Sequence, residues 1–218
     1  ASVTDTFTIV VANTNDAPSI SSTAVTSVNE DASYSYSIAT SDDDSDSSDT
    51  WTITSTSVSW LTLTHTAGAG TAALAGIPDD GDVGVHSVTI TVADAAGLTG
   101  TQTFDITVTN TNDAPSITST GGTAVDEDSL YSYSITTSDD DSDSSDTWTI
   151  SSTSVSWLTL THTAGASTAT LSGTPANGDV GSHSVTVTVA DAAGLTDTET
   201  FTIVVTNTND APSISSTA

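Results

Sequence analysis

The sequence predicts an all-β protein made of tandem Greek-key β-sandwiches joined end to end, each with about seven strands. Two observations lead to this prediction. Apolar residues alternate with Ser and Thr at a period of two along many short segments, and clusters of Gly, Pro, Asn and Asp separate those segments. The whole pattern then recurs after a fixed number of residues, which is typical of a repeated domain.

The expected strands follow one another in the same order in each repeat, and no segment has the period of an amphipathic helix. Clean alternation is typical of antiparallel sheets with one buried face. About seven such strands in roughly 100 residues indicate an immunoglobulin-like sandwich. The residues of the first repeat expected to face the core are, in chain order, Tyr34, Tyr36, Ile38, Trp51, Ile53, Trp60, Leu61, Leu63, His86, Val88, Ile90, Val92, Phe104, Ile106 and Val108.

The string Asn-Thr-Asn-Asp-Ala-Pro marks the end of each repeat. Its Asp is Asp16, Asp113 and Asp210, so successive copies lie 97 residues apart, and about 76 of 97 aligned positions are identical without a gap. A unit of this length can bury its own core. We therefore expect residues 1–16 to be the last strand and linker of a preceding repeat, 17–113 and 114–210 to be full repeats, and 211–218 to begin another.

The charge balance excludes several functions. The chain has 28 acidic residues, no Lys or Arg and a formal net charge of −28. Binding to nucleic acid or to an anionic membrane needs Lys and Arg. Cys is absent, so no disulfide staples the fold, and the apolar runs are too short to span a bilayer. Because no carboxylate can pair with Lys or Arg, the compensating charge must come from solution, and metal ions are the obvious source.

The acids concentrate in five short motifs, each present in both repeats. Carboxylate and amide oxygens in loops are the ligands that calcium prefers. A solvated acidic surface, as in proteins adapted to high salt, is the alternative explanation. In the first repeat and its linkers the motifs are Asn13-Thr-Asn15-Asp16, Asn29-Glu30-Asp31, the loop 41–49, Gly81-Asp82-Val83-Gly84 and Ala93-Asp94-Ala95-Ala96-Gly97.

The order of these motifs resembles tandem cadherin repeats, and more narrowly the cadherin-like, dystroglycan-type or Putative Ig repeats of large bacterial surface adhesins and extracellular fibres. The segment 157–175, with Trp157, Leu158 and Pro175, resembles the signature of the bacterial repeats. The residues that match cadherin motifs are Glu30 and Glu127 near the domain start, Asp42, Asp44, Asp139 and Asp141 in D-x-D, Asp82 and Asp179, the turn residues Asp94 and Asp191, and the linker pairs Asn15-Asp16, Asn112-Asp113 and Asn209-Asp210.

The resemblance implies calcium ions bound at the junctions between repeats. The linker is one residue shorter than in cadherins, which leaves the number of ions per junction open. The complete junction would contain Glu30, Asp82, Asn112, Asp113, Asp139, Asp141 and Asp191. The upstream half-junction would contain Asn15, Asp16, Asp42, Asp44 and Asp94, and the downstream half-junction Glu127, Asp179, Asn209 and Asp210.

Other chemistry receives less support. The loop 41–49 begins like a helix-loop-helix calcium loop but lacks its Gly and its final Glu, which leaves a separate site at Asp46 and Asp49 as a minor alternative. The four His are too separated for a zinc site, and His86 is expected to cap the core. No G-x-S-x-G motif is present, and a glycosidase pair repeated along an array would be unusual, so we expect no enzyme.

The sequence thus favours a calcium-rigidified segment of a long extracellular stalk or filament, as an adhesin extender or a matrix fibre. The alternative is a module that binds glycan or another cell surface. Outward-facing Thr residues fit O-glycosylation, binding of ice or glycan, or simply a polar strand surface. The expected partners are neighbouring repeats of the same chain, with other copies in a fibre and O-linked glycans left open.

Overall fold

The computed structural model describes residues 1–44, 52–141, 149–153 and 155–212. The chain divides into two compact units, unit 1 from Ala1 to Thr111 and unit 2 from Asn112 to Ala218. Each unit contains an all-β sandwich, as the alternation predicts. Among the described residues, no helix is long and apolar enough to span a membrane.

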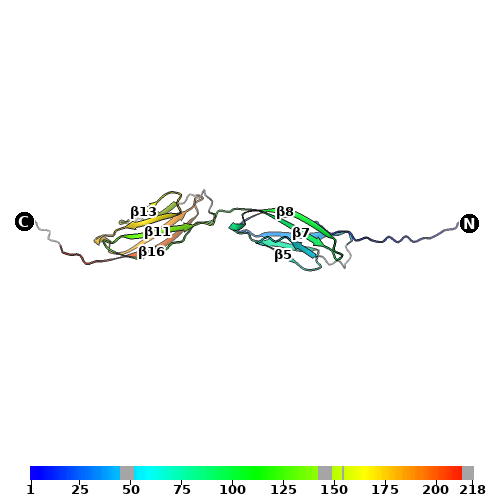
Figure 1. Ribbon diagram of the computed structural model, residues 1–218, viewed down its shortest axis with the longest axis horizontal. Helices are drawn as coiled ribbons and strands as arrows, with labels where there is room; N and C mark the ends of the chain where they lie inside the picture. Colours follow the sequence, from blue (N-terminus) through cyan, green and yellow to red (C-terminus); the bar gives the residue numbers. More distant parts are fainter. Residues whose placement is uncertain (45–51, 142–148, 154, 213–218) are drawn as a thin grey trace, which may run out of the picture. The chain divides into compact units, whose positions relative to one another are not determined.

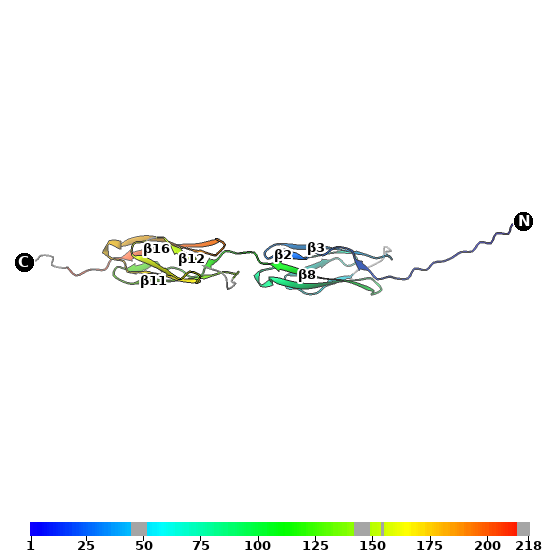
Figure 2. The same ribbon diagram turned by 90° about the horizontal axis from the view of Figure 1, so that it is seen from above.

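Unit 1 contains two four-stranded sheets. One has the order β1-β3-β6-β5 and the other has the order β2-β8-β7-β4. The strands run along the length of the unit, so that its loops gather at two ends (Figures 1 and 2). The strands are β1 (Ser19–Ile20), β2 (Ser27–Asn29), β3 (Tyr34–Ser41), β4 (Thr52–Ser55), β5 (Leu61–His65), β6 (Thr71–Gly76), β7 (Gly84–Ala93) and β8 (Thr99–Thr109), with the 3-10 turn η1 at Asp80–Asp82.

Unit 2 repeats this topology, with sheets β13-β14-β11-β9 and β10-β16-β15-β12. The two sheets lie face to face, as in unit 1 (Figure 2). Its strands are β9 (Ser116–Ile117), β10 (Ala124–Asp126), β11 (Tyr131–Ser138), β12 (Thr149–Ser152), β13 (Leu158–His162), β14 (Thr168–Gly173), β15 (Gly181–Ala190) and β16 (Thr196–Thr206), with the 3-10 turn η2 at Asn177–Asp179.

The core of unit 1 confirms the predicted alternation. Tyr34, Tyr36 and Ile38 of β3 are buried, whereas the Ser residues between them are exposed. Val88, Ile90 and Val92 of β7, together with Ile53, Leu74, Ile106 and Val108, complete the cluster. Burying aliphatic side chains contributes about 1.5–3 kcal/mol each, so the period-two pattern fixes which face of each strand turns inward.

Within its described residues each unit has eight strands, where the sequence predicts about seven. The difference lies at the start of the unit, where β1 pairs with β3 in one sheet and β2 pairs in parallel with β8 in the other. The chain therefore crosses between the sheets after two residues of strand, and both short strands lie at sheet edges. Alternation reports only which side chains face inward and does not show which sheet a segment joins.

The first strand of unit 1 begins at Ser19. In the segment before it, the apolar side chains of Phe7, Ile9 and Val11 are 79, 74 and 88 % exposed. The predicted core residue Trp51 and the candidate calcium residues Asp46 and Asp49 lie outside the described residues.

Candidate metal centre

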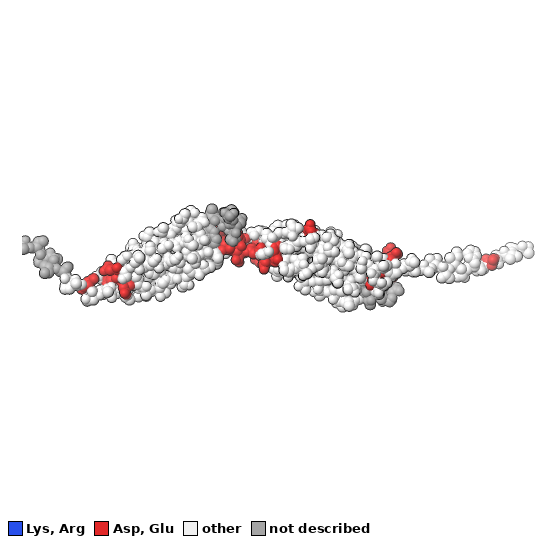
Figure 3. All heavy atoms as spheres, viewed as in Figure 1, with Lys and Arg blue, Asp and Glu red and all other residues white. Residues whose placement is uncertain are grey.

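Most of the described carboxylates gather at the ends of the sandwiches, and few lie on their flanks (Figure 3). We call the end at which the chain enters a unit the entry end; in unit 1 it contains Asn15, Asp16, Asp44 and Asp94. The opposite end is the exit end; in unit 1 it contains Glu30, the turn η1 and Thr111. The two ends have different hydrogen-bond arrangements and are considered separately.

The exit end of unit 1 is built around a buried glutamate. Glu30 follows β2 directly, and only 2 % of it is exposed. Its Oε1 accepts a hydrogen bond of 2.5 Å from the backbone N–H of Thr111, while its Oε2 is buried and has no hydrogen-bond partner among the described residues. Burying a carboxylate is costly unless it is paired with a cation or fully hydrogen-bonded, so this oxygen is a candidate ligand for a cation.

Unit 2 contains the same arrangement. Glu127 is 2 % exposed, and its Oε1 accepts a 2.5 Å hydrogen bond from the backbone N–H of Thr208. Its Oε2 is buried, and the described part of the chain offers it no hydrogen-bond partner. The next residue, Asp128, has a positive φ of 57°, as does Asp31 in unit 1. Asp tolerates this left-handed conformation better than most residues. The buried glutamate and its hydrogen bond to the linker backbone therefore recur in both units.

A second carboxylate at the exit end of unit 1 comes from the turn η1. Carboxylate oxygens of Asp80 and Glu30 lie within 4.8 Å of each other, which is a spacing that one cation could bridge. Asp82, the residue expected from the sequence, accepts hydrogen bonds from the backbone N–H of Asp79 at 3.2 Å and from the Ser59 hydroxyl at 3.1 Å. Asp80 is thus a candidate ligand that the motif comparison missed.

The turn η2 in unit 2 differs at this position. Asp179 holds the turn as Asp82 does, because its carboxylate accepts from the Ala176 N–H at 2.9 Å and the Ser156 hydroxyl at 3.3 Å. The counterpart of Asp80 is Asn177, whose Nδ2 donates to Asp210 Oδ2 at 3.0 Å. Asn209, beside it in the linker, donates to the Asp210 carbonyl at 3.5 Å.

At the entry end of unit 1, the linker is attached to two acidic loops. Asn15 Nδ2 donates to Asp94 Oδ2 at 2.7 Å. The backbone N–H of Asp16 and the Asn13 side chain both donate to the Asp44 carboxylate. Asp42 Oδ1 accepts from the Asp44 N–H at 3.1 Å and so shapes the D-x-D turn. The structure therefore brings together all five residues of the predicted upstream half-junction.

The entry end of unit 2 has matching bonds. Asn112 Nδ2 donates to Asp191 Oδ2 at 2.7 Å, and the Asp113 N–H donates to the Asp141 carboxylate. Asp139 Oδ1 accepts from the Asp141 N–H at 3.3 Å. Linker and loop are separated by 79 residues in the first of these bonds. Because the linker asparagine is uncharged, it does not neutralise the turn aspartate, but its hydrogen bond helps to position that carboxylate.

The turn aspartates have lowered pKa values. Asp94 is lowered first by the hydrogen bond from Asn15 and further by backbone N–H groups that include Leu98, against an opposing effect of burial. Asp191 is lowered in the same way by Asn112 and by the N–H groups of its own turn. Hydrogen bonds to the charged form favour it. Both groups are therefore ionised at neutral pH, as a metal ligand must be.

His86 and Trp60 take the structural roles expected from the sequence. His86 Nε2 donates to the Asp82 carbonyl at 2.5 Å. The ring of Trp60 packs edge-on against both Tyr34 and His86, with centroids 5.6 and 5.9 Å apart. Trp60 borders the buried core cluster of unit 1. These aromatic residues support the exit end from the core side.

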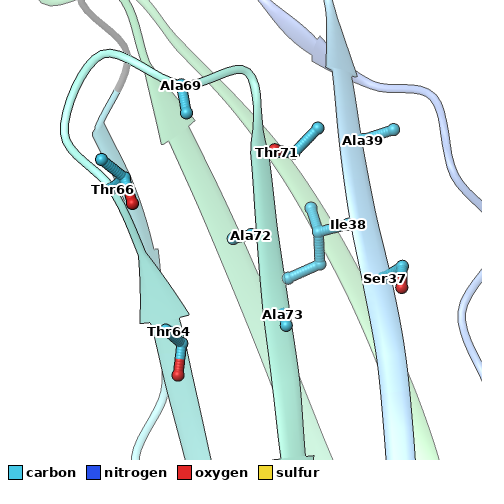
Figure 4. Close-up of a pocket in the computed structure, with 9 residues that line it drawn as sticks. All are labelled: Ser37, Ile38, Ala39, Thr64, Thr66, Ala69, Thr71, Ala72 and Ala73. Carbon is cyan, nitrogen blue, oxygen red and sulfur yellow. The ribbon is translucent and has the colours of Figure 1, made fainter.

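The Thr-rich surface of unit 1 contains one shallow hollow of about 500 Å³ on β3, β5 and β6. Figure 4 shows short side chains around it, among them Ser37, Thr64, Thr66 and Thr71. The nine lining residues are Ser, Thr, Ala and one Ile, and none of them is aromatic or charged. A glycan site normally combines apolar or aromatic contacts with well-placed polar groups, and this hollow offers no ring for stacking.

Comparison with known proteins matches both units to one family. The model of the family described as "Putative Ig domain" matches residues 17–109 and 114–206. No curated protein matches the chain. Protocadherin Gamma B2 extracellular cadherin domains 3–6 match with a TM-score of 0.58 and 16% identity, over 88% of this chain and 46% of that one.

A structure of domains 1–5 of the same protocadherin has a TM-score of 0.56 and 18% identity, over 88% of this chain and 40% of that one. These matches show a cadherin-like fold. An endo-fucoidan hydrolase from glycoside hydrolase family 107 is 29% identical over 85% of this chain, but its TM-score is 0.38 and it carries no argument about function. The chain spans less than half of the length of each of these three structures.

Proposed function

Since the chain belongs to the Putative Ig domain family, as two tandem copies of that domain, we propose that it is a calcium-rigidified structural segment of a long extracellular stalk or filament. Calcium ions bind at the linkers and stiffen the connection between successive repeats. The role requires no catalysis. The observation that carries this proposal is the buried, unpartnered carboxylate oxygen of Glu30, repeated at Glu127.

The first support for a bound cation is the charge of the carboxylates. The chain contains no Lys or Arg to neutralise a buried carboxylate. Two like charges about 4 Å apart repel by about 4 kcal/mol at an effective dielectric constant of 20. Glu30 and Asp80 have oxygens within 4.8 Å. A hard cation with oxygen ligands would replace this repulsion with attraction.

The linker supports a shared site. Thr111 binds Glu30 through its backbone N–H, and Asn112 and Asp113, the next residues along the chain, bind Asp191 and Asp141. These three linker residues are consecutive in the chain, and each is bonded to an acidic side chain. We therefore propose the junction residues Glu30, Asp80, Asp82, Asn112, Asp113, Asp139, Asp141 and Asp191. We propose the same metal-binding role for the half-junctions at the flanking linkers. We also propose that the repeats extend over residues 17–113 and 114–210.

The first experiment is a thermal melt of the chain in calcium and in EDTA, with small-angle scattering on the same samples. A ligand that binds only the folded state at 100 times its Kd stabilises by about 2.7 kcal/mol. We expect a higher Tm and a stiffer particle in calcium. An unchanged melt and unchanged scattering would make the acids a high-salt or solubility adaptation.

Variants localise the effect. Glu30→Gln removes the buried charge while keeping the side chain's size, so we expect it to reduce the calcium-dependent rise in Tm. Asp105→Asn is the matched control, because Asp105 is an exposed acid on β8, away from the ends. If both variants reduce the calcium effect equally, net charge rather than this site is responsible.

A glycan-binding module is the alternative function. The lining of the hollow on β3, β5 and β6 offers no aromatic ring, which favours a spacer. O-linked sugars on the exposed Thr residues are compatible with either role. A glycan array probed with the unmodified chain separates the two functions, since saturable binding to one sugar class would support the module.

A further inference from the structure

The turns η1 and η2 differ between two otherwise similar units. Unit 1 has the sequence Asp79-Asp80-Gly81-Asp82, and unit 2 has Ala176-Asn177-Gly178-Asp179. Of the eight Asn residues in the chain, only Asn177 is followed by Gly. Asn is a thermolabile residue, and its amide is most vulnerable where the next backbone nitrogen can reach it without hindrance.

The reaction is an intramolecular substitution. The backbone nitrogen of Gly178 attacks Cγ of Asn177, ammonia leaves, and a five-membered succinimide forms. Water then opens either carbonyl of the ring and gives aspartate or isoaspartate, so the only co-reactant is water. A side chain on the attacking residue would hinder the attack, and Gly has none.

The structure leaves this turn less restrained in unit 2. In unit 1, Asp79 Oδ1 accepts a hydrogen bond of 3.1 Å from the Gly81 N–H. Ala176 replaces Asp79 and has no side-chain oxygen, so η2 lacks this cap bond. Apart from Gly178 and its two chain neighbours, no described residue has an atom within 4 Å of the position that a Cβ on Gly178 would occupy. Asn177 is exposed, and opening this three-residue turn costs little because it buries no residue.

We propose that Asn177 is a site of spontaneous deamidation, and that its aspartyl product supplies at the exit end of unit 2 the carboxylate that Asp80 supplies in unit 1. Before the reaction, the amide of Asn177 donates to Asp210 at 3.0 Å. Afterwards two carboxylates face each other there. This change adds one negative charge at the exit end of unit 2, and its effect on calcium rests on the proposed function.

The test is to age the purified chain at neutral to mildly alkaline pH and follow each Asn by mass spectrometry. Trypsin cannot be used, because the chain has no Lys or Arg, so cleavage uses a protease specific for aromatic residues. Labelling with protein isoaspartyl methyltransferase reports the second product. We expect Asn177 to convert several-fold faster than each of the other seven Asn residues.

Gly178→Ala is the matched variant, since a Cβ there meets nothing within 4 Å, and we expect it to slow conversion several-fold without altering the fold. Conversion of Asn177 no faster than that of the other Asn residues, or unaffected by Gly178→Ala, would overturn the proposal.

Ageing the chain in calcium and in EDTA separates this proposal from the proposed function. If calcium binds the exit end of unit 2, it should slow conversion of Asn177, and Asn177→Asp should raise calcium affinity. Conversion specific to Asn177 but equal in calcium and EDTA would uphold the modification site and count against calcium at this end.

Discussion

At the residue scale, one glycine in each unit lies where two backbone segments approach each other closely. Gly76 and Gly173 end β6 and β14, and neither has a positive φ. A Cβ at Gly173 would lie 1.8 Å from the backbone oxygen of Trp157, and one at Gly76 would lie 1.9 Å from that of Trp60. Gly is required here by close approach of two backbones rather than by conformation.

We expect Gly173→Ala to destabilise unit 2 by about 1–3 kcal/mol, the usual cost of overpacking. The Trp157 carbonyl belongs to the backbone and cannot move aside as a flexible side chain could. Gly178→Ala is the control in the same unit, with an expected change within about 0.5 kcal/mol. Urea unfolding in EDTA measures both, and equal effects would refute the close-packing explanation.

At the element scale, a polar contact of the same kind joins strands of opposite sheets in each unit. Tyr133 of β11 donates through its hydroxyl to Glu199 Oε2 of β16 at 2.6 Å, and Glu199 Oε1 accepts from the Gly121 N–H at 3.2 Å. In unit 1 the hydroxyl of Tyr36 donates to Gln102 Oε1 at 2.8 Å. An amide and a carboxylate thus perform the same bridging role, because the tyrosine needs only an acceptor.

We expect Glu199→Ala to lower the stability of unit 2 by about 1–3 kcal/mol, because Ala leaves both buried donors unpaired. Glu199→Gln should cost less, because its single amide oxygen still accepts from Tyr133 and only the Gly121 N–H loses its acceptor. Unfolding at neutral pH in EDTA checks this. Equal losses in the two variants would show that the carboxylate charge, rather than the hydrogen bond, matters.

The Glu199→Gln variant should also change how the stability of unit 2 depends on pH above 10. Burial and then the Glu199 carboxylate raise the pKa of Tyr133 from 10.0 to about 12. Its contribution to stability is present below pH 10 and is lost as the pH rises to about 12, because the unfolded chain releases this proton first. Since Glu199→Gln removes a charge that raises this pKa, unit 2 should lose less stability across this interval.

At the scale of the whole molecule, the charge distribution dominates. A net charge of −28 with no Lys or Arg destabilises the compact state through self-repulsion. Because the carboxylates are concentrated at the ends of each sandwich, their mutual repulsion is weaker along the flanks and stronger where the linkers attach. The Debye length falls from about 30 Å at 0.01 M salt to about 10 Å at 0.1 M, so monovalent salt should screen much of this repulsion.

We expect the Tm in EDTA to rise with NaCl concentration, and to rise further when calcium is added at constant ionic strength. The first rise reports general screening and the second reports specific binding. Magnesium is the control cation, because it demands near-octahedral geometry and gives up its water reluctantly. Equal effects of calcium, magnesium and matched NaCl would show that only screening is present.

The sequence by itself determined the repeat length, the all-β class and the inward faces of β3, β7 and β8, because alternation is a local property of the strand. It also located Glu30 and the linker motif, since each is a short run of neighbouring residues. Only the tertiary structure decided that the first strand divides between two sheets, that Asp80 lies beside Glu30, and that Asn15 meets Asp94 across 79 residues. Contacts between residues so far apart in the sequence depend on how the sheets pack. The period-two alternation contains no information about them.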